Sequence, residues 1–265
     1  DQILMLRATN GTSWSQVQLP STGGSMFPLI VTAMVFVDTD RGYIATSQLS
    51  GLSMENKIHT TDNGGMSWSE VTTTSGEVRH FQALPGGSIF GVGSFGVVRT
   101  SDGQTWTESA VDEPAPDVVP RHVAMLNDTC GWLVGGLPAD ADAGRPNASD
   151  GAVWYTADGG ATWTVRASGL PFFLRSASFV AGDLGWAAGQ RSGDTGVLAV
   201  TQDGGSTWAE VAVADHPALP NACMMGQCLD TPTAVSDMLN VRMWDAARGV
   251  ASGIAGLGAI TIVGN

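Results

Sequence analysis

A turn phrase that combines Asp or Asn with Gly and Trp occurs five times along the chain and constrains its fold more than any other feature. Full copies are TDNGGMSW (61–68), TADGGATW (156–163) and TQDGGSTW (201–208), and shortened copies are ATNGTSW (8–14) and TSDGQTW (100–106). The tryptophans that end the copies are separated by 54, 38, 57 and 45 residues. This spacing is typical of a four-stranded propeller blade that carries loops of variable length.

The residue types of the phrase are those that a tight hairpin turn requires. An Asp or Asn side chain can accept hydrogen bonds from backbone amides a few residues ahead, and a Thr hydroxyl adds another local bond. Gly accepts the positive φ of such a turn, and the Trp is expected to turn inward and bury its ring against the neighbouring blade. We therefore assign structural and not catalytic roles to Asn10, Trp14, Asn63, Trp68, Asp102, Trp106, Asp158, Trp163, Asp203 and Trp208.

Short apolar and Gly-aromatic runs around each turn predict four antiparallel strands per unit. Four units are predicted at 31–72, 78–109, 120–168 and 174–213. A fifth would combine 238–265 with 1–19, so that strands from both ends of the chain share the closing blade and leave no open edge. The sequence thus predicts an all-β protein, a single propeller domain over 1–265 with five four-stranded blades.

One detail leaves six blades as the alternative. Both ILMLRA (3–8) and GAITIVGN (258–265) have the pattern of the third strand of the closing blade. Either one of them pairs as an extra strand, or the native chain continues.

These motifs resemble a known family. The pattern S/T-x-D-G-G-x-T-W is the Asp-box, or BNR, repeat of sialidase-like propellers. Together with the FVD and GY or GW runs, it is most similar to the photosystem II stability and assembly factor-like proteins, over nearly the whole chain. The resemblance implies a β-propeller. It is less informative about function, because Asp boxes occur in sialidases, sortilin-type receptors, xyloglucanases and noncatalytic scaffolds.

A second pattern appears when the units are aligned on the Gly of their second strand, or on its equivalent Ile89. Arg79, Arg121 and Arg175 then occupy one position in three successive blades, near the start of the innermost strand. Three guanidinium groups at the rim of the central channel would bind a carboxylate or a phosphate. Alternatively, they pair with carboxylates of the 107–120 loop and tie the blades together.

The residues that follow two of these arginines are His80 and His122. Strand alternation points them away from the arginines, so we expect them to pack against the neighbouring sheet.

The segment CMMGQC places Cys223 and Cys228 close together and predicts a local disulfide. A Cu(I) site with the nearby Met and His residues, or free thiols, are the alternatives. We expect no metal and no cofactor. A disulfide fits an oxidising compartment, so we expect the protein outside the cytoplasm, either secreted, periplasmic or in a thylakoid lumen.

Charge and the missing motifs narrow the function. A net charge of -13, with Lys57 as the only lysine, excludes nucleic acid as a general partner. The longest apolar run, FPLIVTAMVFV (27–37), is too short to span a membrane. There is no Gly-rich phosphate loop, no HExxH helix, and no Tyr near the predicted rim to act as a sialidase nucleophile. We therefore expect no enzymatic activity.

The sequence favours a noncatalytic binding or assembly scaffold that presents a loop-rich face and an Arg-lined channel mouth to a protein partner. Such a partner would carry an acidic or carboxylate-bearing segment. One alternative is a carbohydrate-binding or sialidase-like, glycan-processing propeller. Another is a structural module of a larger extracytoplasmic assembly.

Overall fold

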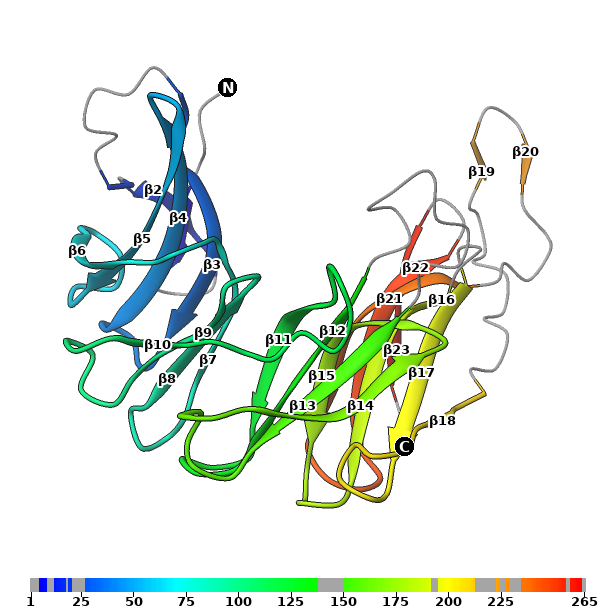
Figure 1. Ribbon diagram of the computed structural model, residues 1–265. Helices are drawn as coiled ribbons and strands as arrows, with labels where there is room; N and C mark the ends of the chain where they lie inside the picture. The colour runs from blue at the N-terminus through cyan, green and yellow to red at the C-terminus, as the bar shows by residue number, and fades with distance from the viewer. Residues whose placement is uncertain are drawn as a thin grey trace. The chain divides into compact units, whose positions relative to one another are not determined.

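The computed structural model in Figure 1 describes residues 5–8, 12–17, 19–20, 27–137, 150–191, 195–212, 223–224, 227–228, 235–255 and 258–263. All the regular secondary structure in these ranges consists of β-strands. Four four-stranded antiparallel sheets follow one another along the chain, and each is consistent with a propeller blade. The predicted all-β class is therefore confirmed.

The four sheets contain sixteen strands in chain order. The first has β3 (Ile30–Phe36), β4 (Gly42–Ser50), β5 (Ser53–Thr61) and β6 (Ser69–Thr73); the second has β7 (Val78–Ala83), β8 (Ile89–Gly93), β9 (Gly96–Thr100) and β10 (Thr107–Ser109). The third has β11 (Val119–Met125), β12 (Gly131–Gly136), β13 (Gly151–Thr156) and β14 (Thr164–Leu170); the fourth has β15 (Phe173–Phe179), β16 (Gly185–Arg191), β17 (Thr195–Thr201) and β18 (Ala209–Glu210).

The strands near the two ends of the chain form separate small sheets. β1 (Met5–Ala8) pairs with β2 (Trp14–Val17), and β21 (Val235–Met243), β22 (Gly249–Ala255) and β23 (Gly258–Val263) form a three-stranded sheet. A short hairpin of β19 (Cys223–Met224) and β20 (Gln227–Cys228) comes between β18 and β21 in the sequence. Of the two competing third strands, β23 thus pairs with β22, and β1 pairs with β2. The number of blades and the shared closing blade stay predictions.

The chain divides into two compact units, which we describe separately. The first contains Asp1–Asp112, Pro120–Gly131 and Thr156–Trp163; the second contains Glu113–Val119, Trp132–Tyr155 and Thr164–Asn265.

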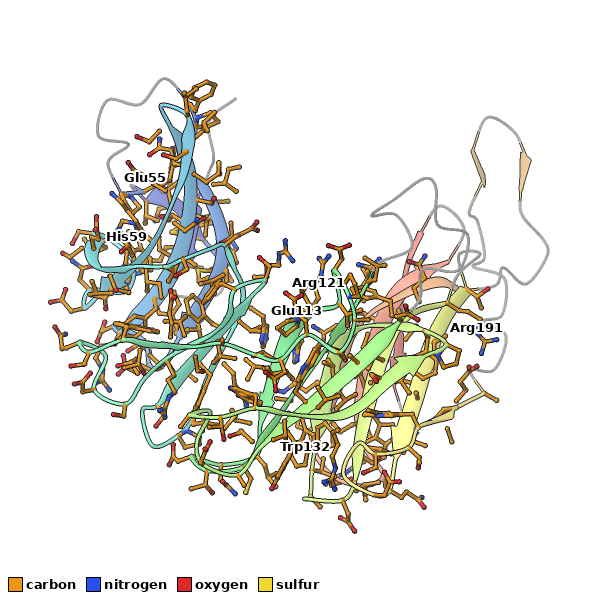
Figure 2. The ribbon with its side chains drawn as sticks, in the orientation of Figure 1. Glu55, His59, Glu113, Arg121, Trp132 and Arg191 are labelled. Atoms are coloured by element: carbon orange, nitrogen blue, oxygen red, sulfur yellow. The ribbon has the colours of Figure 1, made fainter. Side chains whose placement is uncertain are left out.

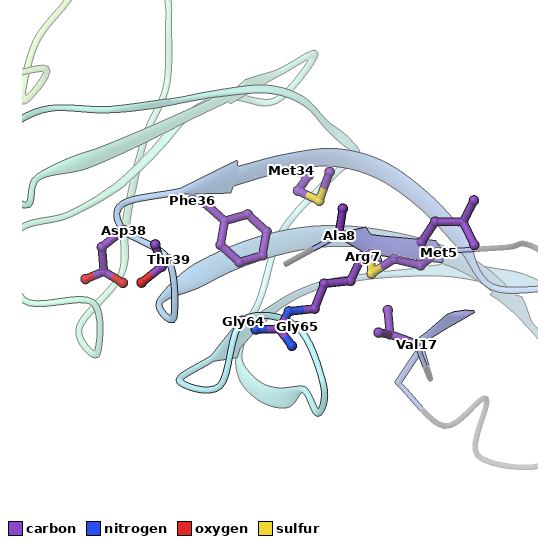
Figure 3. A pocket seen from close by; sticks show the side chains of 11 residues that line it. Met5, Arg7, Ala8, Val17, Met34, Phe36, Asp38, Thr39, Gly64 and Gly65 are labelled. Atoms are coloured by element: carbon purple, nitrogen blue, oxygen red, sulfur yellow. The ribbon is translucent and has the colours of Figure 1, made fainter. Parts of the chain in front are cut away.

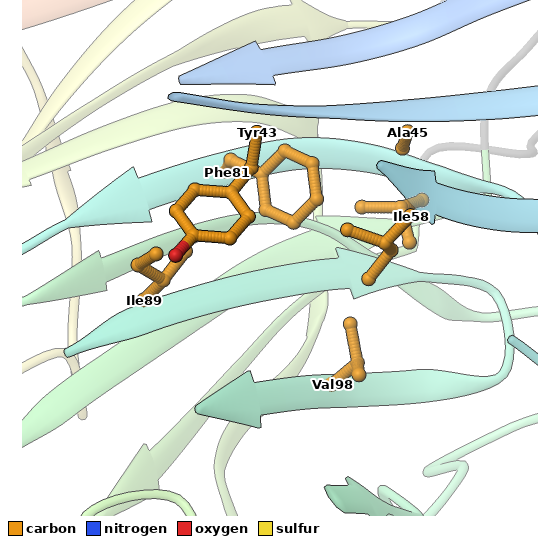
Figure 4. Packing of buried hydrophobic residues seen from close by; sticks show 7 residues of the cluster. Tyr43, Ala45, Ile58, Phe81, Ile89 and Val98 are labelled. Carbon is orange, nitrogen blue, oxygen red and sulfur yellow. The ribbon is translucent and has the colours of Figure 1, made fainter. Parts of the chain in front are cut away.

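In the first unit, the first two sheets share an apolar core. Figure 4 shows Tyr43, Ala45 and Ile58 of the first sheet against Phe81, Ile89 and Val98 of the second. The residues of β3 alternate, so that Ala33 and Val35 pack on this core, whereas Met34 and Phe36 are 56% and 40% exposed. Two sheets thus pack face to face through one side-chain face of each, as neighbouring blades do.

In the second unit, the core is built on aromatic stacking. The ring of Trp132 stacks on Phe179 with centroids 3.8 Å apart and planes 3° apart. Trp132 Nε1 donates a hydrogen bond of 2.8 Å to the carbonyl of Gly204, so its polar atom is satisfied although the residue is buried. Met238, Val241 and other apolar residues of the C-terminal sheet pack on the fourth sheet.

The turn phrases close on themselves through a repeated set of hydrogen bonds. Thr156 Oγ1 donates to Asp158 Oδ1 (2.8 Å) and accepts from the Gly160 amide (2.9 Å). The Asp158 carboxylate also accepts from the Thr162 amide (2.9 Å) and hydroxyl (2.6 Å). Gly159 and Gly160 have φ of +69° and +77°, which L side chains rarely adopt. The box formed by Thr201, Asp203 and Thr207 has the same bonds.

The three full boxes are also held by residues outside them. The Gly159 amide donates to the Thr129 carbonyl (2.8 Å), in the turn between the first two strands of the same sheet. The Gly159 carbonyl accepts from Arg99 Nη1 (2.8 Å), on the third strand of the preceding sheet. In the second unit, Arg166 Nη2 reaches the Asp203 carbonyl (3.5 Å). The boxes therefore link successive sheets.

The Trp residues of the boxes are not all buried to the same degree. Trp106 packs edge-on against Tyr43 of the preceding sheet, with centroids 5.6 Å apart, and Trp163 is 4% exposed. Trp68 contacts Phe36 of its own sheet. Trp14 differs, with an exposed fraction of 65%. Its box partner Asn10 lies outside the described residues.

Polar side chains join the first strands of neighbouring sheets where backbone pairing stops. Thr32 Oγ1 of β3 donates to the Val78 carbonyl of β7 (2.6 Å). Gln82 of β7 bonds both the amide (2.6 Å) and the carbonyl (2.9 Å) of Met125 on β11. These bonds satisfy backbone groups that would otherwise be buried without a partner.

His80 and His122 also lie between the first strands β7 and β11, in a contact that we call the His80 seam. The Val123 amide donates to His80 Nδ1 (3.4 Å), and the two imidazoles stack with centroids 3.8 Å apart. Burial lowers the pKa of His80 to about 4. Burial, and secondarily the neighbouring His80, hold the pKa of His122 well below its ordinary value. The structure thus places both histidines in packing between sheets.

The boxes should make stability depend on acidic pH. Hydrogen bonds from the Thr162 hydroxyl and amide lower the pKa of Asp158 from 3.8 to about 2. Because the folded state holds the ionised form, this contribution is complete above about pH 4 and is lost as the pH falls toward 2. We expect Asp158→Ala to lower the urea midpoint at pH 7 more than Asp158→Asn, which resembles the natural Asn63. A midpoint unchanged by Asp158→Ala would contradict this role.

As the pH is lowered, the His80 seam should lose its contribution to stability before the boxes lose theirs. Unfolded His80 gains a proton below 6.5, whereas the folded imidazole resists protonation down to about pH 4. The contribution of His80 to the free energy of unfolding is complete above pH 6.5, and it decreases by about 3 kcal/mol as the pH falls from 6.5 to 4. We expect His80→Gln, which keeps an acceptor for the Val123 amide, to flatten the free energy of unfolding in this range. An equally steep pH dependence in the variant would count against the seam.

Candidate functional site

The three arginines predicted to line the channel lie on the first strands of three successive sheets. Arg79 is the second residue of β7, and Arg121 and Arg175 are the third residues of β11 and β15. Each is partly buried. Arg79 and Arg121, the latter labelled in Figure 2, belong to the first unit, and Arg175 belongs to the second.

The backbone at these positions has a feature that the sequence did not reveal. The register of β7 with β8 shifts between Val78 and His80, so that Arg79 is the inserted residue of a β-bulge. The register of β15 shifts in the same way between Leu174 and Ser176, at Arg175. A bulge interrupts strand alternation and changes the direction of the side chain that it carries.

The bulge recurs at the equivalent positions of the first and C-terminal sheets. There the shifts fall at Thr32, between Val31 and Ala33, and at Leu239, between Met238 and Asn240. Four sheets of the described chain therefore interrupt the first strand at the position where the sequence alignment places the Arg trio. Bulges that recur at one position are features of a fold and are common beside binding sites.

The partners of the arginines differ. Arg175 Nη2 donates to Gln190 Oε1 (3.3 Å), and its guanidinium lies 5.2 Å from the centroid of the Phe173 ring. In contrast, the Arg79 guanidinium forms no ion pair or hydrogen bond with any residue that the structure describes.

The 107–120 loop has an ordered turn just before β11. The Val118 amide donates to the Ala115 carbonyl (3.2 Å), and Asp117 has φ of +64°. Pro116 followed by a residue with positive φ is typical of a type II turn, in which Asp is tolerated. This turn leaves Asp117 exposed in the second unit.

Two further predictions concern the cysteines and metal binding. The backbones of Cys223 and Cys228 are direct cross-strand partners in the β19–β20 hairpin, but their side chains lie outside the described residues. No group of three or more His, Cys, Asp or Glu residues in the described ranges could hold a metal ion. Nor do the described residues include a helix long and apolar enough to cross a membrane.

Comparison with known proteins was made by sequence and by structure. No protein-family model matches the sequence, and no curated protein matches it. Among solved structures, YCF48 from Cyanidioschyzon merolae aligns over 99% of this chain and 76% of its own, with 14% identity and a TM-score of 0.55.

The Niastella koreensis GH74 enzyme aligns over 97% of this chain, with 16% identity and a TM-score of 0.61. This chain spans only 40% of that enzyme. At these identities the matches establish a shared fold and leave function open. The resemblance of this chain to Asp-box β-propellers, YCF48 among them, is therefore confirmed at the level of the fold.

Proposed function

We propose that the protein is a noncatalytic binding scaffold that holds an acidic or carboxylate-bearing segment of a protein partner through Arg79, Arg121 and Arg175. The observation that carries the proposal is Arg79. This arginine lies at a recurring bulge, and its charge has no carboxylate partner among the described residues. Arg121 occupies the matching position on the next first strand of the same unit.

The chemistry of these groups favours an anionic ligand. A guanidinium presents a planar fork of N–H donors that matches a carboxylate and stays charged at any physiological pH. Because the chain as a whole carries a charge of -13, a group of arginines stands out as a local exception. Association through them should weaken as the salt concentration rises.

The carboxyl groups support the noncatalytic part of the proposal. A glycoside hydrolase generally needs one carboxyl group whose pKa is raised so that it can act as an acid. Every described carboxyl group with a resolved shift has a lowered pKa: Asp38, Glu55, Asp102, Asp158, Asp203 and Asp245. Hydrogen bonds, most of them within turns, are the main cause in each case.

The proposal includes an extracytoplasmic location with a Cys223–Cys228 disulfide. Its support is the placement of the two cysteines opposite each other in a hairpin. A bond there would close the hairpin of a long loop in an oxidising compartment.

The binding proposal predicts that removing two charges weakens partner capture. We expect immobilised Arg79→Gln, Arg121→Gln protein to retain its partner from native extract at least tenfold less than the unmodified chain, because charged hydrogen bonds contribute about 1.5–3 kcal/mol each. Arg248→Gln is the matched control, since it removes an exposed arginine that already pairs with Asp245. Circular dichroism and the urea midpoint would verify that the variants fold.

Capture by the double variant equal to that of the control would overturn the proposal. Retention of glycans in place of a protein would favour the carbohydrate-binding alternative.

We also propose that five blades close into a ring, in which the β1–β2 hairpin completes the blade that β21, β22 and β23 begin and one strand pairs as an extra strand. The support lies in the first unit. MLRATNGTSW (5–14) aligns with VVRTSDGQTW (97–106), so Arg7 is the equivalent of Arg99. Arg99 reaches the first box Gly of the next sheet, and Arg7 likewise lies against Gly64, where a Cβ would stand 2.5 Å from Arg7 Nη2.

Figure 3 shows Arg7 extending toward Gly64 beside Phe36 and Met34. The β1–β2 hairpin therefore docks on the first sheet as the last half of a blade docks on the blade after it.

Ring closure has a specific cross-linking signature. β23 lies beside β22, with Thr261 opposite Ser252, so β1 would pair with the other edge of β23. With the native cysteines replaced by serine, we expect Met5→Cys, Thr261→Cys protein to form an intramolecular product with a short thiol-specific cross-linker. The control pairs Thr261→Cys with Ser15→Cys on β2, one strand farther away. A product no more abundant than that of the control would exclude the closing blade.

A further inference from the structure

A cavity of about 480 Å³ lies between the second sheet and two turns of the third, and none of the Arg trio lines it. Its lining residues all belong to the first unit. Asp128, in the turn between β11 and β12, and Gly159, in the box of the third sheet, form one side. The other side consists of β8, β9, β10 and the box between the last two.

Two groups of opposite charge meet in this cavity. A Cβ on Gly159 would stand 2.6 Å from the Asp128 carbonyl and 3.8 Å from Arg99 Nη1. Apart from its bond to the Gly159 carbonyl, the Arg99 guanidinium forms no hydrogen bond or ion pair with the part of the chain that the structure describes. The exposed Asp128 carboxylate forms none with the same residues and lies against Gly86, where a Cβ would stand 3.1 Å from Oδ2. N–H donors and carboxylate acceptors therefore remain for a ligand.

Hydroxyl groups form much of the remaining lining. Those of Ser88, Ser101 and Thr107 make no hydrogen bond to any described residue. Asp102 differs, because its Oδ1 already accepts from two amides of its own turn (2.8 and 2.7 Å). The buried ring of Phe90 adds an apolar part. Since a hydroxyl can both donate and accept, the lining offers bonds of either kind.

The cavity follows from a difference in sequence between the sheets. When the boxes are aligned, Tyr155 is the equivalent of Arg99, and Arg166 is the equivalent of Ser109. In the second unit the Arg166 guanidinium lies 5.5 Å from the centroid of the Tyr155 ring and reaches the next box. Ser109 is much shorter, and its hydroxyl donates to the Gly160 carbonyl (2.9 Å). The second sheet therefore leaves open the space that a long side chain crosses in the second unit.

We propose that this cavity binds a neutral sugar through Arg99 and Asp128. An anion would be repelled by the carboxylates of Asp102 and Asp128, and a cation would be repelled by the Arg99 guanidinium. Neighbouring hydroxyl groups of a sugar suit both charges, because each can accept from an N–H group and donate to a carboxylate. The C–H groups of a sugar ring can pack against Phe90.

The size of the cavity agrees with this ligand. Sites for small molecules have volumes of roughly 300–1,000 Å³ and a few polar groups that fix the orientation of the ligand. The sugar site goes beyond the binding of an acidic protein segment, and it depends neither on the Arg trio nor on the closing blade.

The test is a titration of isotope-labelled protein with neutral monosaccharides, namely glucose, galactose, mannose and xylose, followed by the amide signals in NMR spectra. We expect at least one of them to shift the Gly159 signal to saturation. Asp128→Asn keeps the shape of the side chain and removes its charge, and Thr107→Val replaces a hydroxyl by a methyl group. Each should raise the Kd about threefold or more. Asp62→Asn is the matched control, because Asp62 is an exposed carboxylate of the first box, outside the cavity.

The spectra of the variants would also verify that they fold. No saturable shift with any of the four sugars would overturn the proposal. So would a Kd that Asp128→Asn changes no more than Asp62→Asn does. Binding of the anionic sugar N-acetylneuraminate or the cationic sugar glucosamine, without binding of a neutral one, would show an ionic site and contradict the assignment. Because no residue of the Arg trio is changed, none of these results alters the expected effect of the arginine variants on partner capture.

Discussion

The hydrogen bonds that close the Asp boxes are the interaction on which the rest of the structure depends. One Thr hydroxyl joins an Asp or Asn side chain to a Gly amide four residues ahead, as in Thr156, Asp158 and Gly160. The turn that results presents its first Gly to two neighbours. One is the turn between the first two strands of its own sheet, and the other is the third strand of the preceding sheet. A local turn therefore sets the position of one sheet on the next.

The proposed binding residues differ from this framework in their chemistry and in the strands that carry them. The box carboxylates are engaged in turns, and their lowered pKa values keep them ionised and unsuited to donate a proton. Arg79 and Arg175 instead lie on first strands at bulges, where the chain departs from regular pairing, and Arg121 is the third residue of the first strand β11. A propeller can vary the residue at such a position from sheet to sheet, from Thr32 to Arg79 to Leu239, without changing the pairing around it.

Much of the fold follows from sequence because its signals are local. Alternation of apolar residues, as along β3, indicates strands, and the Asp, Gly and Trp spacing indicates the turns between them. The alignment also brought the three arginines to equivalent positions. It could not show the bulges, because an inserted residue needs no particular side chain: Thr, Arg and Leu all occupy the position.

Two other features depend on contacts between distant segments. Trp14 ends a shortened copy of the turn phrase and is exposed, because the burial of a box Trp depends on a neighbouring sheet and not on the turn itself. Likewise, the choice between β1 and β23 beside β22 is invisible in sequence, because both segments have the same strand pattern.

Arginines on one sheet donate hydrogen bonds to the box of the next sheet. A single sheet is therefore not the cooperative unit of unfolding. Arg99 couples the third strand of the second sheet to the box of the third, and in the second unit Arg166 on β14 and Trp132 on β12 reach the box of the fourth sheet. The stability of such an array is a sum of the free energies of the single repeats and of the interfaces between neighbouring repeats. Damage to one box should therefore loosen two adjacent repeats together, and hydrogen exchange should protect amides in overlapping pairs of sheets.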